Sequence, residues 1–83
     1  MKFTAAITRE RNVTFTVLLV KGGIINSSNR ESVRSSAPAN LPRPIILAEQ
    51  KSSGKMLYHG KADITRFLST VPYHALPWKD YTV

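Results

Sequence analysis

The sequence predicts a small α+β protein: an antiparallel sheet of about four strands in two hairpins, one short helix near the C-terminus and an extended aromatic tail. Apolar and polar residues alternate before residue 20 and again at 55–59, and residues 45–50 are strongly β-forming, which is typical of strands. Between residues 64 and 71 the apolar residues recur at helical spacing instead. A chain of 83 residues supports one modest core, so we expect a single domain over 1–83.

The first hairpin is predicted before residue 21. Apolar residues alternate from Lys2 to Thr8, a charged stretch interrupts at 9–12, and the alternation resumes from Val13 to Val20. The run Leu18–Val20 is apolar on both faces of its strand, so this end is expected to be central in the sheet or covered by another segment. A second copy of the chain is one candidate cover, which makes homodimerisation a hypothesis.

Residues 26–44 are predicted to form a long flexible loop. The segment is rich in Ser, Asn, Arg, Ala and Pro and holds only two larger aliphatic residues, too few to offset the entropy of ordering it. Loops of this length in small domains commonly bind partners or connect elements. The alternative is a short helix at 29–35, with Asn29 as its cap and Glu31 in its first turn.

The second hairpin and the helix follow Pro44. Ile45–Gln50 and Lys55–His59 are β-forming runs that flank a polar turn. After Gly60 the period changes to that of a helix, which begins near Asp63 and is stopped by Pro72. The apolar face of this helix is formed by Ile64, Phe67, Leu68 and Val71.

Residues 44–68 resemble the closing β-hairpin and helix of glutaredoxin-like domains. The resemblance is carried by a proline before a strand, a Gly-Lys turn and a helix that begins near Asp63. It covers less than a third of the chain. The βαβ unit and the redox cysteines of that family are absent, so the resemblance implies shared local geometry and no shared activity.

Residues 72–83 are predicted to form an extended C-terminal arm. Large aromatic residues alternate there with two prolines, and such side chains have to pack against something. Trp and Tyr commonly anchor protein contacts, so Tyr73, Trp78 and Tyr81 are the predicted partner-binding residues. The alternative is that Trp78 folds back onto the sheet of its own domain.

Charge gives the leading functional hypothesis. The chain has 12 Lys plus Arg against 5 Asp plus Glu, a formal charge of +7 and a pI of about 10.3, which favours nucleic acid as the partner. The cations concentrate on predicted turns and the long loop. The predicted phosphate-binding residues are Arg9, Arg11, Arg30, Arg34, Arg43, Lys51 and Lys55. At roughly −0.9 per phosphate, seven such contacts predict a log-affinity against log-salt slope near about −6.

Other features limit the kind of nucleic-acid binding that the sequence predicts. Zinc-ligand spacing, an aromatic ribonucleoprotein strand and a basic helix are absent, so little sequence specificity is expected. Tyr58 is a candidate for stacking on an unpaired base, or else a half-buried cross-strand partner. The competing interpretation of the charge is a solvated surface that keeps the protein soluble and its edge strands unpaired.

The same composition argues against an enzyme. Without cysteine there is no disulfide, thiolate nucleophile or zinc finger. His59 and Asp63 are four residues apart, but Gly60 and the strand-to-helix junction separate them, so a helical metal site is not implied, and His59 and His74 are interpreted as ordinary surface or turn histidines. No metal or cofactor is therefore expected. The absence of a signal-peptide pattern and of a long apolar run predicts a cytoplasmic location without membrane contact. The expected partners are nucleic acid, bound without sequence specificity, or a larger protein assembly in which the chain is an adaptor, inhibitor or small subunit.

Overall fold

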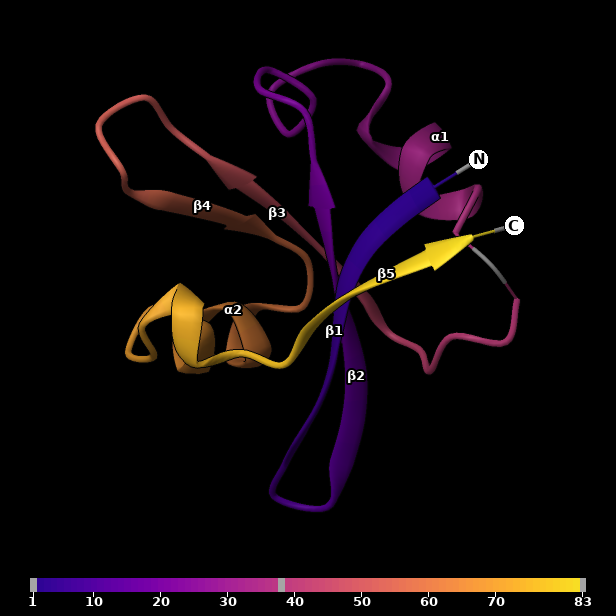
Figure 1. The fold of residues 1–83 in the computed structure, drawn as a ribbon, viewed down its shortest axis with the longest axis vertical. Coiled ribbons are helices and arrows are strands. Elements are labelled where there is room, and N and C mark those ends of the chain that lie inside the picture. Colours follow the sequence, from indigo (N-terminus) through magenta and orange to yellow (C-terminus); the bar gives the residue numbers. More distant parts are fainter. Residues whose placement is uncertain (1, 38, 83) are drawn as a thin grey trace.

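The computed structural model describes residues 2–37 and 39–82 and confirms a small α+β architecture (Figure 1). The strands are β1 (Lys2–Glu10), β2 (Val13–Val20), β3 (Ile45–Gln50), β4 (Met56–His59) and β5 (Trp78–Thr82). The helices are α1 (Arg30–Ser35), α2 (Ala62–Leu68) and the short 3-10 helix η1 (Tyr73–Ala75). Position 38 of the predicted loop and position 83 of the predicted arm lie outside the described residues.

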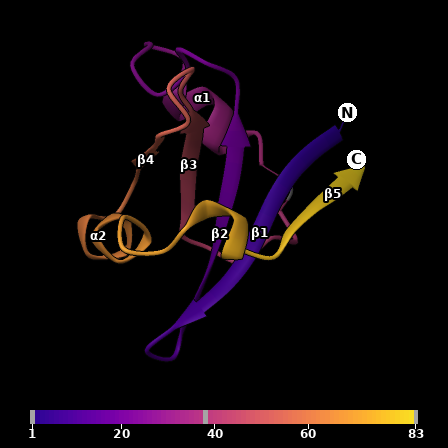
Figure 2. The same cartoon turned by 60° about the vertical axis from the view of Figure 1, so that its left-hand side comes forward.

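The strands form one sheet in the order β4-β3-β2-β1-β5 (Figure 2). Three neighbouring pairs are antiparallel, but β2 and β3 run parallel, with Thr16 opposite Ile45. The predicted sheet of about four antiparallel strands is therefore corrected to a mixed sheet of five in the described part of the chain. The parallel direction of β3 follows from the long connection 21–44, which returns the chain to the end of the sheet where β2 begins. Alternation in the sequence predicts that a strand exists and does not give its direction.

Both predicted hairpins are confirmed. In the first, Glu10 pairs with Val13, so the turn consists of Arg11 and Asn12 alone. Both turn residues have positive φ, 50° and 66°, which matches the twist of two-residue hairpins. Since β3 begins opposite Thr16, the tip of the β1–β2 hairpin projects beyond the rest of the sheet, at the bottom of Figure 1.

One face of the sheet is covered by α2 and η1 (Figure 2). Its buried residues, here called the α2-side core, are Ala6, Phe15, Val17, Ile46, Ala48, Ile64, Leu68 and Leu76. The predicted helix is confirmed, and the Asp63 carboxylate accepts a hydrogen bond from the Ile64 amide at 2.9 Å within its first turn. Gly60, just before α2, passes so close to β3 that a Cβ there would overlap the end of the Ile46 side chain.

The other face is covered by α1 and its flanking segments. Its buried residues, here called the α1-side core, are Ala5, Leu18, Ile25, Ala37, Leu41, Ile45 and Leu47. The segment predicted as a loop thus contributes two of them, and the Thr16 hydroxyl donates to the Pro42 carbonyl at 2.7 Å. The flexibility of this segment stays a prediction.

Helix α1 is the short helix that the sequence offered as the alternative to a loop, so the expectation of one helix becomes two α-helices in the described residues. Asn29 occupies the cap position, but its side chain makes no capping hydrogen bond. Tertiary contacts hold the helix instead: Val33 packs against the α1-side core, and Arg34 bonds to β3 and β4. Helix propensity and capping signals alone therefore underestimate the stability of α1, because tertiary contacts hold this helix in place.

The C-terminal segment differs from the predicted extended arm. It forms η1 and then β5, whose Trp78 and Tyr81 lie opposite Ala6 and Phe3 of β1. Trp78 packs against the α2-side core and Tyr81 against the α1-side core, so Trp78 folds back onto its own sheet. Pairing with β1 gives the backbone groups of both strands hydrogen-bond partners. Because the segment contains prolines, its sequence did not predict a strand.

Candidate nucleic-acid interface

A hollow of about 460 Å³ lies where β3 begins and β4 ends. It is lined by Arg34, Arg43, Pro44, Ile45, His59, Gly60 and Lys61, and we call it the anion hollow. The lining includes three cations and a histidine but no carboxylate. Antiparallel pairing of β3 and β4 creates this meeting point, because it places the loop before β3 beside the segment in which β4 leads into α2.

Arg34 is the structural member of this group. Its Nε donates to the Ile45 carbonyl at 3.1 Å and its Nη2 to the His59 carbonyl at 3.0 Å, while Nη1 is bonded to the Glu31 carboxylate. Only 20% of the side chain is exposed. Arg34 therefore ties α1 to β3 and β4, and its charge is paired with that of Glu31 behind the hollow.

His59 lines the hollow as a neutral ring. Its Nδ1 lies 2.6 Å from Nη2 of Arg34, and because a guanidinium only donates, Nδ1 must accept. The ring proton then resides on Nε2, which is a donor. Partial burial lowers the pKa of His59, and the charges of Arg30 and Arg34 lower it further, against a smaller raising effect of Glu31.

Arg43 and Lys61 are the cations of the anion hollow that remain accessible. Both are exposed, and neither forms an ion pair with any residue that the structure describes. Arg43 makes one long hydrogen bond, from Nη2 to the Ala37 carbonyl at 3.4 Å. With His59 Nε2, these groups give the hollow hydrogen-bond donors and positive charge, which is the chemistry that phosphate requires.

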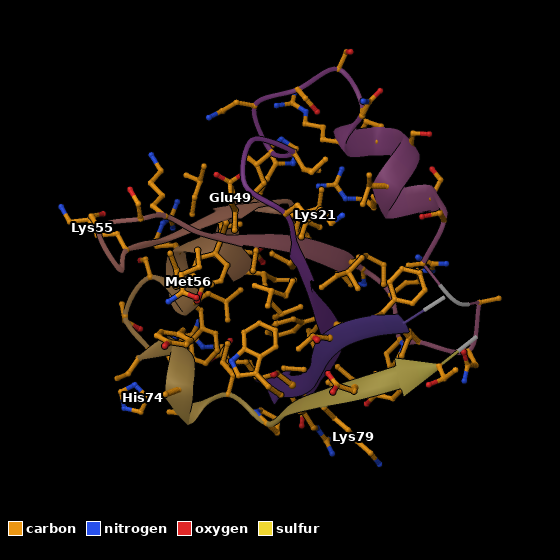
Figure 3. All side chains as sticks on the ribbon, turned by 45° about the horizontal axis from the view of Figure 1, so that its top comes forward. Lys21, Glu49, Lys55, Met56, His74 and Lys79 are labelled. Atoms are coloured by element: carbon orange, nitrogen blue, oxygen red, sulfur yellow. The ribbon has the colours of Figure 1, made fainter. Side chains whose placement is uncertain are left out.

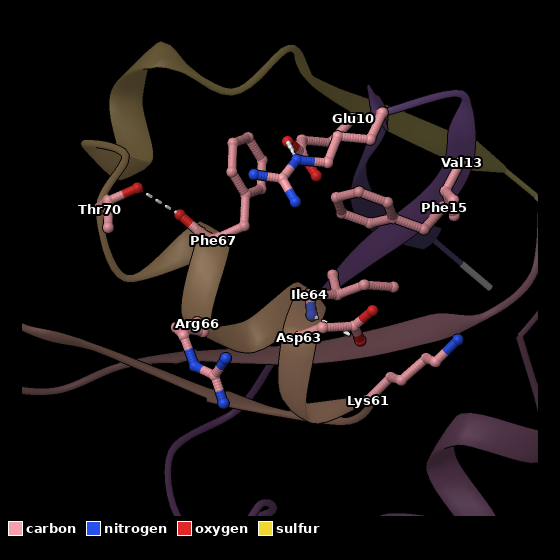
Figure 4. A pocket seen from close by; sticks show the side chains of 10 residues that line it. Glu10, Val13, Phe15, Lys61, Asp63, Ile64, Arg66, Phe67 and Thr70 are labelled. Atoms are coloured by element: carbon pink, nitrogen blue, oxygen red, sulfur yellow. Dashed lines mark hydrogen bonds and ion pairs between the residues drawn. The ribbon is translucent and has the colours of Figure 1, made fainter.

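A second hollow of about 350 Å³ shares Lys61 with the first, and Figure 4 shows the residues that line it. It lies between the projecting β1–β2 hairpin and α2, and we call it the aromatic groove. Its lining comprises Glu10, Arg11, Val13, Phe15, Lys61, Asp63, Ile64, Arg66, Phe67 and Thr70. Its two carboxylates already have partners: Glu10 lies 3.3 Å from Nε of Arg11, and Asp63 accepts from a helix amide.

The structure brings three of the seven predicted phosphate-binding residues to these hollows. They are Arg11, Arg34 and Arg43. Arg9 lies near the same hairpin tip and donates to the Asn12 side chain at 3.1 Å. Arg30 lies on α1 and donates to the Ile25 carbonyl at 3.3 Å.

Lys51 and Lys55 lie at the opposite end of β3, in the β3–β4 turn. A six-residue strand separates its two ends by roughly 17 Å at about 3.3 Å per residue, so these lysines are remote from the anion hollow. Figure 3 shows Lys55 pointing away from the sheet at this end, where Lys21 and Glu49 also lie.

Sequence reasoning missed Lys61 and Arg66 as binding residues. Summing charge by segment hid Arg66, because Asp63 and Asp80 cancel Arg66 and Lys79 between residues 62 and 83. The helical pattern contained the missing signal: Arg66 is three residues after Asp63, away from the apolar face, and Lys61 directly precedes the helix. The face of α2 that turns away from the core was therefore predictable as partly cationic.

The predicted aromatic anchors have separate surroundings. Tyr73 is 38% exposed, whereas Trp78 is half-buried and donates from Nε1 to the Tyr73 carbonyl at 2.6 Å. Tyr81 is half-buried, with Lys79 Nζ 6.0 Å from its ring centroid. Tyr58 is half-buried beside the α2-side core, its hydroxyl has no hydrogen-bond partner among the described residues, and burial raises its pKa.

No family model, curated protein or solved structure matches this chain. Within residues 2–37 and 39–82, no helix has the length and apolar character that crossing a membrane requires. In the same residues, no three His, Asp or Glu side chains gather into a group that could hold a metal ion.

Proposed function

We propose that this protein is a non-enzymatic module that binds nucleic-acid phosphates with little sequence specificity. The observation that carries the proposal is the anion hollow, where Arg43 and Lys61 are exposed, without ion pairs among the described residues, and backed by Arg34 and a neutral histidine donor. A cationic lining without a carboxylate attracts phosphate and gains affinity from released counterions.

The binding set differs from the seven residues expected from the sequence. Arg43, Lys61 and Arg66 are exposed cations at the two hollows, and none of them forms an ion pair within the described part of the chain. Three phosphate contacts predict a slope of log affinity against log salt of about −2 to −3, at roughly −0.7 to −0.9 for each phosphate. Arg9, Arg30, Lys51 and Lys55 then act mainly through the overall field of the protein.

Two matched double variants test the location of the binding site. Arg43→Gln with Lys61→Gln removes two charges at the anion hollow, and Lys51→Gln with Lys55→Gln removes two charges at the far end of β3. Binding to a labelled oligonucleotide is followed by fluorescence anisotropy over a range of salt concentrations. We expect the hollow variant to reduce the steepness of the salt slope by about 1.4–1.8 and the far-end variant to leave it nearly unchanged.

Equal effects of the two variants would show that total charge, not the hollow, governs binding. A wild-type affinity that does not respond to salt would contradict phosphate binding altogether.

The alternative function, a protein adaptor anchored by the aromatic arm, now depends on Tyr73. This ring is exposed, while Trp78 and Tyr81 pack against the two cores of the protein itself. A partner at this end would therefore contact Tyr73 and the neighbouring edge of η1.

A further inference from the structure

We propose that the interface takes single-stranded rather than double-stranded nucleic acid, with a phosphate in the anion hollow and a neighbouring base in the aromatic groove. The inference rests on the proposed function and adds the strand state of the ligand. It begins from the chemical difference between two hollows that share Lys61.

The aromatic groove offers apolar surface that phosphate cannot use. Phe15 and Ile64 line the groove but are only 1% and 7% exposed, so the aromatic face that a base can reach belongs to Phe67, which packs against the α2-side core (Figure 4). Phe67 is only half-buried, so part of its ring remains available. Aromatic surface beside a cationic track is the combination that holds stacked bases of single strands.

A duplex can contact the anion hollow but not the apolar wall of the aromatic groove. Its phosphates could enter the anion hollow, but its bases are stacked inside the helix and would leave the apolar wall of the groove exposed. A single strand carries both phosphates and unpaired bases, so it can supply a group to each hollow, with Lys61 lining both. Their volumes of about 350 and 460 Å³ lie in the range of pockets that hold small ligands.

The groove also explains weak sequence preference. Glu10 is paired with Arg11, and Asp63 accepts from the Ile64 amide, so one oxygen of each carboxylate is already engaged before a base arrives. Stacking, which every base can provide, then dominates over hydrogen-bond recognition of base edges.

The test compares three labelled probes of equal length: an oligothymidylate single strand, a mixed-sequence duplex and a single strand of abasic residues. We expect the oligothymidylate to bind about tenfold more tightly than either other probe at the same salt concentration. The abasic strand keeps the phosphates and removes only the bases, so this comparison needs no protein variant.

Phe67→Leu locates the base. It removes the aromatic face, keeps most of the apolar volume, and is expected to weaken oligothymidylate binding about five- to tenfold without changing duplex binding. Phe3→Leu makes the same chemical change beside the α1-side core and is expected to leave both affinities unchanged. Thermal melting of both variants checks that they remain folded at the assay temperature.

The outcomes separate the two proposals. Duplex or abasic probe bound as tightly as oligothymidylate would overturn the single-strand inference and leave phosphate binding intact. Failure of all three probes to bind would overturn the proposed function as well. Equal losses from Phe67→Leu and Phe3→Leu would remove the aromatic groove from the binding site.

Discussion

Arg34 illustrates how the position of a cation decides its role. Three of its donors are engaged with the Ile45 carbonyl, the His59 carbonyl and His59 Nδ1. Replacing it by glutamine leaves these partly buried acceptors without a donor, so Arg34→Gln is expected to lower the free energy of unfolding by about 1–3 kcal/mol. Urea unfolding monitored by Trp78 fluorescence measures the loss.

Arg66→Gln is the matched control for that loss. It removes the same charge from an exposed side chain that makes no hydrogen bond or ion pair within the described part of the chain. Exposed substitutions of this kind change the free energy of unfolding by less than about 0.5 kcal/mol. If the two variants lose the same stability, the effect belongs to charge and the hydrogen bonds of Arg34 contribute nothing measurable.

His59 gives the fold a dependence on pH of definite sign. Partial burial and the charges of Arg30 and Arg34 lower its pKa below the ordinary value of 6.5, despite Glu31. The unfolded chain therefore binds the proton at a higher pH than the folded protein does. Stability is expected to be constant above about pH 6.5 and to fall as the pH drops from there toward the lowered pKa of the folded state.

Urea unfolding midpoints measured from about pH 8 down to pH 5 test this expectation. These pH values lie above the range in which Glu31 changes its protonation, because the bond to Arg34 lowers the pKa of Glu31 from 4.5. His59→Gln should flatten the profile between about pH 5 and 6.5. His74→Gln, a change of the second histidine on η1, should retain the wild-type shape. A wild-type midpoint that rises on acidification would have the wrong sign.

The elements differ in how far the sequence predicts them. Helix α2 has a clear period because it presents one face to a core, and β1, β2 and β4 show alternation over part of their length, whereas β3 is recognised from its β-forming residues because it is buried on both faces. Helix α1 has no such period: its position depends on bonds from Arg34 to strands that follow it in the chain. Strand β5 is short and follows Pro77, so its own sequence does not indicate a strand. It forms by pairing with β1, which is distant in the sequence.

Strand β5 and η1 are expected to be required for folding. Truncation after Val71 removes Leu76 and Trp78 from the α2-side core and Tyr81 from the α1-side core, and it exposes the backbone of β1. We expect the truncated chain to lose its cooperative unfolding transition, measured by circular dichroism and by dispersion of amide resonances.

Tyr73→Ala is the control at this end of the chain. Tyr73 is 38% exposed, and the hydrogen bond that it accepts from Trp78 uses its backbone carbonyl, which alanine retains. The variant should therefore fold normally. If the truncated chain also remained folded, residues 72–83 would not be required for folding, and the hypothesis that they form a partner-binding arm would be favoured again.

At the scale of the whole molecule, the sequence predicted the charge and could not predict where it gathers. Lys51 and Lys55 are adjacent to a turn, as expected, and the antiparallel pairing of β3 with β4 places that turn at the end of β3 opposite the anion hollow. Lys61 becomes central because both hollows meet at it. These relations follow from tertiary topology, which local composition does not encode.

The two cores should unfold together, because they are the two faces of one sheet and share β1, β2 and β3. Leu68→Ala removes a fully buried side chain from the α2-side core, and Leu41→Ala removes a 3% exposed one from the α1-side core. Each loss is expected to cost about 2–5 kcal/mol. At roughly 4–8 °C per kcal/mol for a domain of this size, each variant should lower the single melting temperature by at least about 8 °C. Calorimetry provides the measurement, with equal calorimetric and van't Hoff enthalpies as the sign of one transition. If Leu41→Ala instead splits the transition and leaves the upper step at the wild-type temperature, α1 and its flanking segments fold independently of the sheet, and the support that Arg34 gives to the anion hollow can be lost without unfolding the protein.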